Sequence, residues 1–154
     1  MDDPKAGIFR RLVALLIDVF ILDLLGILTA YPLQKELEIS VKDILDPLLT
    51  GSGISQELIL FIFLYATLMT FLWGCYFTFF IGWDGQTPGK KMLGIRVKRV
   101  DGRPIDYSTA GTRFIGYSVS ASVLMIGFLW ALFDENNQTW HDKMAQTIVV
   151  KNGS

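Results

Sequence analysis

Arg11, Asp18 and Asp23 are the residues whose types and spacing point most directly to chemistry, because they lie in an apolar stretch that continues to Lys35. Arg11 and Asp18 are seven residues apart, close to two helical turns, so they fall on one helical face about 10 Å apart along the axis. An aspartate within a bilayer costs about 3 kcal/mol to insert. We therefore expect Asp18 to face protein or water and to have a partner.

Two interpretations of Asp18 stay open on the sequence alone. In the structural one, Arg11 lies near the headgroups and Asp18 is held by it or by another segment. In the functional one, Asp18, together with Asp23, forms a protonatable cation site in a water-filled crevice.

Other chemistries find little support. Gly89-Lys90 resembles the end of a phosphate-binding loop, but Asp84 replaces that motif's first glycine and Lys91 replaces its Ser or Thr. The single histidine, His141, has no second metal-ligand pattern around it. We expect no enzymatic activity, no metal ion and no cofactor, and the net charge of −1 indicates no nucleic-acid partner.

The composition is that of a membrane protein. Of 154 residues, 51% are hydrophobic and only 19% are charged, whereas soluble domains carry nearer a quarter. About 20 apolar residues cross the hydrocarbon core as a helix. We therefore expect one all-α polytopic membrane domain over residues 1–154, with three hydrophobic helical segments at about 12–32, 58–82 and 113–133.

The distribution of basic residues predicts the sidedness. Lys5, Arg10 and Arg11 precede the first segment, and the connection over 84–112 is rich in Lys and Arg, whereas the 33–57 loop is mainly acidic. By the positive-inside rule, the N-terminus and the basic connection lie in the cytoplasm. This predicts a multi-pass protein of the inner membrane.

The second segment carries a small residue at every fourth position, which allows close approach of another helix. Packing against the first helix is the favoured interpretation, and contact within an oligomer is the alternative. The stripe comprises Ala66, Thr70, Gly74, Thr78 and Gly82.

The basic connection has a pattern of its own. Residues 95–98 alternate apolar and basic, and Asp101-Gly102 is typical of a hairpin turn. We expect a short cytoplasmic β-hairpin over 92–105. Residues 147–150 are another strand candidate, and no internal repeat is evident.

The third segment determines where the C-terminus lies. A full crossing puts the C-terminus and Asp142 outside, which its length and lack of charge favour. A re-entrant segment would instead return the 147–150 strand to the cytoplasm, where Asp142 could meet Arg11 or the basic connection. We expect the external C-terminus.

Three blocks of sequence resemble the RDD family of prokaryotic membrane proteins, which is named for one arginine and two aspartates. The blocks are residues 6–18, 85–97 and 140–150. The resemblance implies that the motif residues are Arg11, Asp18 and Asp142. Asp23 lies outside the motif, and Gln146 stands where the family often has glycine. Sodium/proton antiport has been proposed for some members of the family, so the resemblance makes it a candidate activity of this chain.

The expected function is therefore a structural or accessory component of the membrane. The alternative is cation/proton transport by an oligomer that uses Asp18, because three segments are too few to enclose an alternating-access site alone. We expect the lipid bilayer and either a second copy or a partner membrane subunit as neighbours. Anionic lipid or a cytoplasmic protein would meet the basic hairpin.

Overall fold

The computed structural model describes residues 4–122, 127, 130–134 and 137–152. The chain is mostly helical, with one antiparallel pair of strands, and it divides into two compact units. One unit combines Met1–Val19 with Gly74–Ser154, and the other is Phe20–Trp73. The sequence-based interpretation of 1–154 as one domain stays a prediction.

Two long helices are the membrane-spanning candidates among the described residues. Helices α1 (Ile8–Glu36) and α3 (Gln56–Asp84) have 29 residues each, or about 43 Å at 1.5 Å per residue. This length exceeds the roughly 30 Å hydrocarbon core. Large apolar side chains along both helices are exposed, among them Phe20, Ile27 and Phe63, as expected for helices that face lipid.

The Phe20–Trp73 unit holds parts of α1 and α3 together at Gly26. A Cβ added there would lie 2.8 Å from Cε of Met69, so glycine permits this close approach. Helix α2 (Val41–Thr50) begins with a capping box between Ser40 and Asp43, and it has no buried residue.

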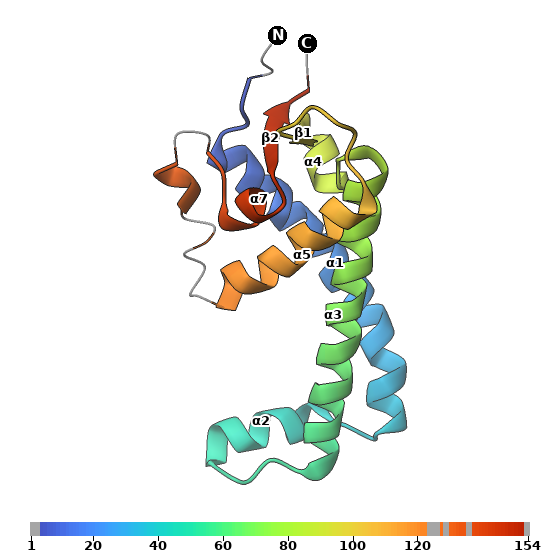
Figure 1. Ribbon diagram of the computed structural model, residues 1–154. Helices are drawn as coiled ribbons and strands as arrows, with labels where there is room; N and C mark the ends of the chain where they lie inside the picture. The colour runs from blue at the N-terminus through green and yellow to red at the C-terminus, as the bar shows by residue number, and fades with distance from the viewer. Residues whose placement is uncertain (1–3, 123–126, 128–129, 135–136, 153–154) are drawn as a thin grey trace. The chain divides into compact units, whose positions relative to one another are not determined.

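The other unit is built around a two-stranded sheet (Figure 1). Strand β1 (Ile95–Arg99) pairs with β2 (Thr147–Lys151), and Val97 lies opposite Val149 at the centre. Helix α4 (Pro88–Met92) precedes β1, and α7 (Trp140–Met144) precedes β2. The core residues here are Ala6, Ala14, Ile81, Ile95, Val97, Ala110 and Val149.

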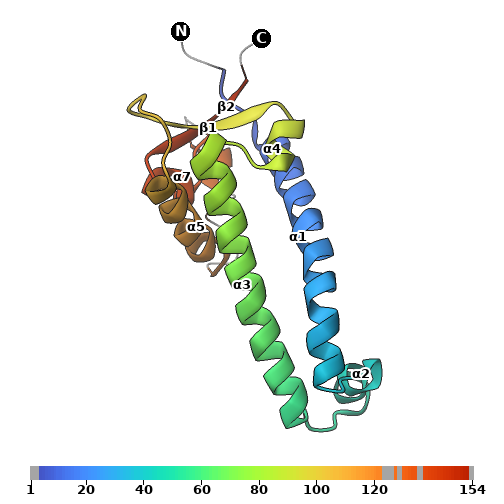
Figure 2. The same ribbon diagram turned by 90° about the vertical axis from the view of Figure 1, so that its right-hand side faces the viewer.

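The segments α4–β1 and α7–β2 have the same local order, a five-residue helix followed by a five-residue strand, and their strands lie side by side (Figure 2). Each begins with a threonine N-cap, Thr87 or Thr139, followed by a five-residue helix. Each then passes through a residue in the left-handed region, Gly94 at φ 61° or Gln146 at φ 52°, into its strand. The two segments share the cap threonine and a Lys-Met pair at 91–92 and 143–144, and the expectation of no internal repeat in the sequence stays a prediction.

The predicted hairpin was also wrong. Gly102 does adopt a positive φ of 75°, but residues 103–106 after it form no strand, and α5 (Tyr107–Ser122) comes next. Pro104 has no N–H to donate to a ladder, whereas 147–150 offers a β-branched run. Strand β1 therefore pairs with β2 instead of with its own sequence neighbours.

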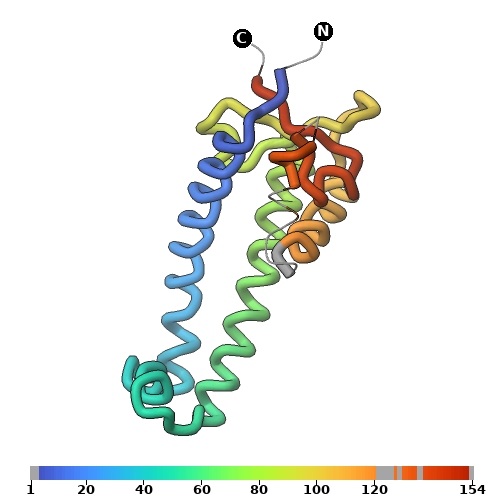
Figure 3. Tube along the Cα trace, turned by 90° about the vertical axis from the view of Figure 1, so that its left-hand side faces the viewer, coloured from blue at the N-terminus to red at the C-terminus, as the bar shows by residue number. Residues whose placement is uncertain are grey.

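This pairing corrects the expected position of the C-terminus. Strand β2 pairs with β1 from the basic connection, and Val150 also forms a bridge with Lys5. Figure 3 shows the N-terminal segment and β2 side by side. Strands cannot pair across a bilayer, so the C-terminus lies on the same side as the N-terminus and the 84–112 connection.

The third predicted segment is only partly described. Helix α5 (Tyr107–Ser122) has 16 residues and begins within the basic connection, and a short 3₁₀ turn, η1 (Trp130–Leu132), follows. Residues 123–126 and 128–129 of the predicted 113–133 segment lie outside the described residues. Helix α5 packs on α7, where Gly116 fits against His141. Among the described residues the candidate spans are α1 and α3. A full crossing by the 113–133 segment does not fit the pairing of β1 with β2, and the re-entrant alternative stays a prediction.

The small-residue stripe of α3 meets α5 at two positions. A Cβ on Gly74 would lie 3.1 Å from Phe114, and one on Gly82 would lie 2.3 Å from Tyr107. At these two positions the neighbour is α5, not α1 as favoured from the sequence. Thr78 is partly buried, whereas Ala66 and Thr70 are exposed.

We predict that Gln146→Gly stabilises the protein by about 0.5–1 kcal/mol, because a non-glycine residue at positive φ carries strain that glycine does not. Gly94→Ala is the matched control at the equivalent position. Its Cβ would meet nothing within 4 Å, so only the strain at φ 61° remains, and a loss of about 1 kcal/mol is expected. Thermal unfolding in detergent measures both changes. Equal effects of the two substitutions would contradict the account.

Candidate functional site

Thr87-Pro88-Gly89 turns the end of α3 into α4. The Thr87 hydroxyl accepts a hydrogen bond from the Lys90 backbone N–H at 3.3 Å, as an N-cap does, and Pro88 occupies the start of the helix. Thr87 is fully buried. This cap presents a hydroxyl and a free backbone N–H to α1.

Asp18 accepts hydrogen bonds from this cap. Its carboxylate accepts from the Tyr76 hydroxyl at 2.8 Å, the Thr87 hydroxyl at 2.5 Å and the Gly89 backbone N–H at 2.8 Å. The Asp18 side chain has no exposed surface. Gly89 is required here, because a Cβ would lie 2.2 Å from the Ala14 carbonyl oxygen. Asp18 thus holds α4 against α1 through neutral donors.

Asp142 has the corresponding place in the second helix–strand segment. It completes a capping box with Thr139, accepting from the threonine N–H at 3.0 Å and from the hydroxyl at 2.7 Å. Its other contacts are charged. Arg113 of α5 and Arg11 of α1 each donate to one of its oxygens. The carboxylate therefore joins α1, α5 and α7.

The electrostatics of this cluster are strong because its members are buried. Arg113 is 1% exposed and Asp142 is fully buried. Burial by itself raises the pKa of the Asp142 carboxyl, but Arg113 and then Arg11 outweigh it, so the pKa lies well below its ordinary value. Asp142 is ionised at every physiological pH. Losing either guanidinium would leave part of a buried charge uncompensated.

Arg11 and Arg113 also bind neutral groups. Arg11 donates to the Asn137 carbonyl, and Arg113 donates to the Thr147 hydroxyl at the start of β2. The two guanidiniums thereby connect α1 and α5 to the chain on both sides of α7.

Arg11, Asp18 and Asp23, which the sequence placed in one candidate site, have separate surroundings in the structure. Arg11 pairs with Asp142, and among the described residues no ion pair joins Arg11 to Asp18. Asp23 is exposed and belongs to the other unit. The described residues contain no group of three His, Cys, Asp or Glu side chains placed to hold a metal ion.

Sequence reasoning missed Arg113, Thr87 and Thr139 as parts of the site. The pattern Thr139-x-x-Asp142 is a readable capping-box signal. Arg113 directly precedes an apolar run, where a cation needs a partner. No comparable signal marks Thr87, because its partner Asp18 is 69 residues away.

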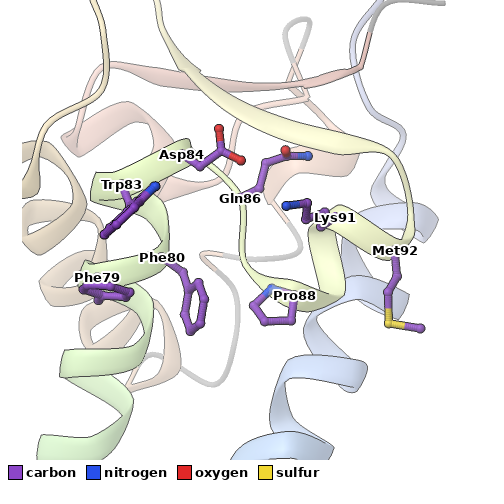
Figure 4. A pocket seen from close by; sticks show the side chains of 8 residues that line it. All are labelled: Phe79, Phe80, Trp83, Asp84, Gln86, Pro88, Lys91 and Met92. Atoms are coloured by element: carbon purple, nitrogen blue, oxygen red, sulfur yellow. The ribbon is translucent and has the colours of Figure 1, made fainter.

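A groove lies on another face of the same unit, between the end of α3 and α4 (Figure 4). Its volume is about 550 Å³. Phe79, Phe80 and Trp83 form one wall, and Pro88 and Met92 lie across from them. Asp84, Gln86 and Lys91 supply its polar atoms, and Arg96 binds Asp84 at 3.0 Å.

These features define a helical membrane protein in which Asp18 and Asp142 hold two short helix–strand segments against α1. The family model of the RDD family matches residues 5–146, so the chain belongs to this family. That Arg11, Asp18 and Asp142 are the family's motif residues stays a prediction from the resemblance of the three blocks.

A curated relative, the proline-rich antigen homolog of Mycobacterium tuberculosis, is 31% identical over 70 residues, both in strain ATCC 25618 / H37Rv and in strain CDC 1551 / Oshkosh. The match covers 45% of this chain and 29% of each relative, so the chain spans under a third of their length. No solved structure matches the chain.

His141 provides a pH test of the cluster. Burial lowers its pKa well below 6.5, although Asp142 opposes this, and it is the chain's only histidine. Because the pKa of His141 is lower in the folded than in the unfolded state, the neutral imidazole contributes its full stability above about pH 6.5. That contribution to the free energy of unfolding is lost as the pH falls below about 6.5. We predict a loss of up to about 1.4 kcal/mol per pH unit between pH 6.5 and 5.

Thermal unfolding in detergent between pH 7.5 and 5 measures this loss. His141→Asn is the control, because it removes the titrating group and should flatten the dependence over that range. A wild-type protein whose stability is constant from pH 7.5 to 5 would contradict the buried, neutral His141.

Proposed function

We propose that this protein is a non-enzymatic structural or accessory component of the inner membrane. The observation that supports this is the state of Asp18 and Asp142, because both carboxylates are buried and bound by donors of the chain itself. Each holds one short helix–strand segment onto α1. A carboxylate bound in this way stabilises the contact between protein segments. It is not free to bind and release cations or protons from water.

The proposed topology has two crossings. Helices α1 and α3 would cross the bilayer, and the chain would then stay on one side from Asp84 onward, because β1 and β2 pair there. The positive-inside rule makes this side the cytoplasm. Under this arrangement the 113–133 segment does not cross.

The proposed neighbours are lipid and another membrane helix. Ala66 and Thr70 of the stripe are exposed within a candidate span, so a second copy or a partner subunit could pack there. The basic residues of the 84–112 connection would face anionic headgroups or a cytoplasmic protein.

Cation/proton transport is the competing proposal, and the burial of Asp18 within a candidate span favours it. Asp18 would then have to release the Tyr76, Thr87 and Gly89 donors for each ion it binds. The two proposals differ in what Asp18→Asn does.

We predict that the protein in liposomes with an internal pH-sensitive dye shows no proton flux after sodium, potassium or lithium pulses. Asp18→Asn should instead lower stability by about 1–3 kcal/mol, because the amide cannot accept all three hydrogen bonds. Asp23→Asn is the matched control. Asp23 is exposed, so its change should stay within about 0.5 kcal/mol.

Thermal unfolding gives the stability change, and protease accessibility verifies the orientation in the liposomes. A cation-dependent flux that Asp18→Asn abolishes and Asp23→Asn preserves would overturn the structural proposal in favour of transport.

A further inference from the structure

A small cavity beside the Asp142 cluster concentrates positive charge. Its volume is about 60 Å³, whereas one water needs about 10–15 Å³. Three cations line it, Arg11, Lys90 and Arg113. Tyr117, Thr139 and His141 add polar groups, and aliphatic side chains from the first turns of α1 complete the wall.

The charges around the cavity do not balance. Arg11 and Arg113 share one carboxylate, that of Asp142. Asp18 does not line the cavity, and its oxygens already accept three hydrogen bonds. Because His141 is neutral at pH 7, three positive charges face a single negative charge.

Lys90 is the cation without an acid. The residue is 6% exposed, and its ammonium lies 5.7 Å from the centroid of the Phe77 ring. Among the described residues, its ammonium forms no ion pair. Lys90 follows the cap residue Thr87 by three positions, as Asp142 follows the cap residue Thr139. A lysine therefore stands in α4 where α7 has a carboxylate. A buried cation without an anion is costly.

Arg113, which lines the cavity, also has an unsatisfied donor. Nε of Arg113 is buried and has no hydrogen-bond acceptor within the described part of the chain. Buried donors in folded proteins almost always have an acceptor, so this N–H is unusual. The unpaired ammonium and the guanidinium group of Arg113 thus place uncompensated positive charge beside the cavity, which favours an anion there.

We propose that this cavity binds a phosphate-class oxyanion. A tetrahedral phosphate offers several acceptor oxygens, which suit a guanidinium fork, an ammonium and neighbouring hydroxyls together. The phosphate comes either from free inorganic phosphate or from the headgroup of an anionic lipid. The start of an apolar helix lies at headgroup depth, so both sources can reach the site. This inference does not depend on the proposed accessory role.

The test is thermal unfolding of the full-length protein in neutral detergent that is free of phosphate. In one arm, sodium phosphate is compared with sodium chloride at equal ionic strength. In the other, phosphatidylglycerol is compared with phosphatidylcholine added to the micelles. We expect phosphate, phosphatidylglycerol or both to raise the melting temperature above the matched control, since a ligand of the folded state stabilises it. The arm that responds identifies the source.

Lys90→Met and Lys91→Met form a matched pair on α4. Lys91 is exposed and does not line this cavity, so its variant should retain the anion response. Lys90→Met should weaken the apparent affinity by about tenfold or more. Without anion it should be at least as stable as the wild type, because the apolar stem still packs while a buried charge is removed. Lys90→Arg keeps the charge and should keep the response.

Three results would overturn the proposal. One is a wild-type protein that responds to neither phosphate nor phosphatidylglycerol beyond the controls. Another is an equal loss of response in both methionine variants, which would indicate a general surface charge effect. The third is a Lys90→Met protein that is markedly less stable than wild type in anion-free detergent, since Lys90 would then have a purely structural role.

Discussion

The burial of the Asp142 carboxylate between Arg11 and Arg113 is the constraint on which the rest of this unit depends. A fully buried carboxylate is tolerated only where strong donors surround it, and here the donors come from α1, α5 and the cap of α7. Moving any one of these elements would leave a charge unpaired. The ion pairs therefore fix where α7 lies, and with it the strand that follows.

Both helix–strand segments begin with a threonine cap whose hydroxyl donates to a carboxylate, but the carboxylate comes from a different element in each. In α7–β2 the threonine cap donates its hydroxyl to Asp142 of its own helix. In α4–β1 the corresponding hydroxyl of Thr87 donates to Asp18, which α1 supplies. The position that Asp142 has in one segment holds Lys90 in the other. Asp18 and Asp142 thus accept hydrogen bonds from equivalent threonine caps, and Lys90 adds its charge to the cationic cavity.

The sequence predicts the features that depend on local composition. Long apolar runs foretold α1 and α3, and the alternation at 95–98 foretold β1. Prediction from the sequence failed for contacts between residues that are far apart in the chain. Nothing near Asp101-Gly102 shows that β1 pairs with 147–151, and the donors to Asp18 come from residues 58 to 71 positions away. Periodicity also cannot reveal that Arg113 pairs with Asp142.

A double-mutant cycle between Arg11 and Asp142 tests the central claim most directly. Arg11→Gln, Asp142→Asn and the double variant are compared with the wild type by thermal and denaturant unfolding in detergent. The account predicts a coupling free energy of about 1.5 kcal/mol or more, because replacing either residue removes the direct, buried ion-pair partner of the other. Additive effects, with a coupling below about 0.5 kcal/mol, would contradict it.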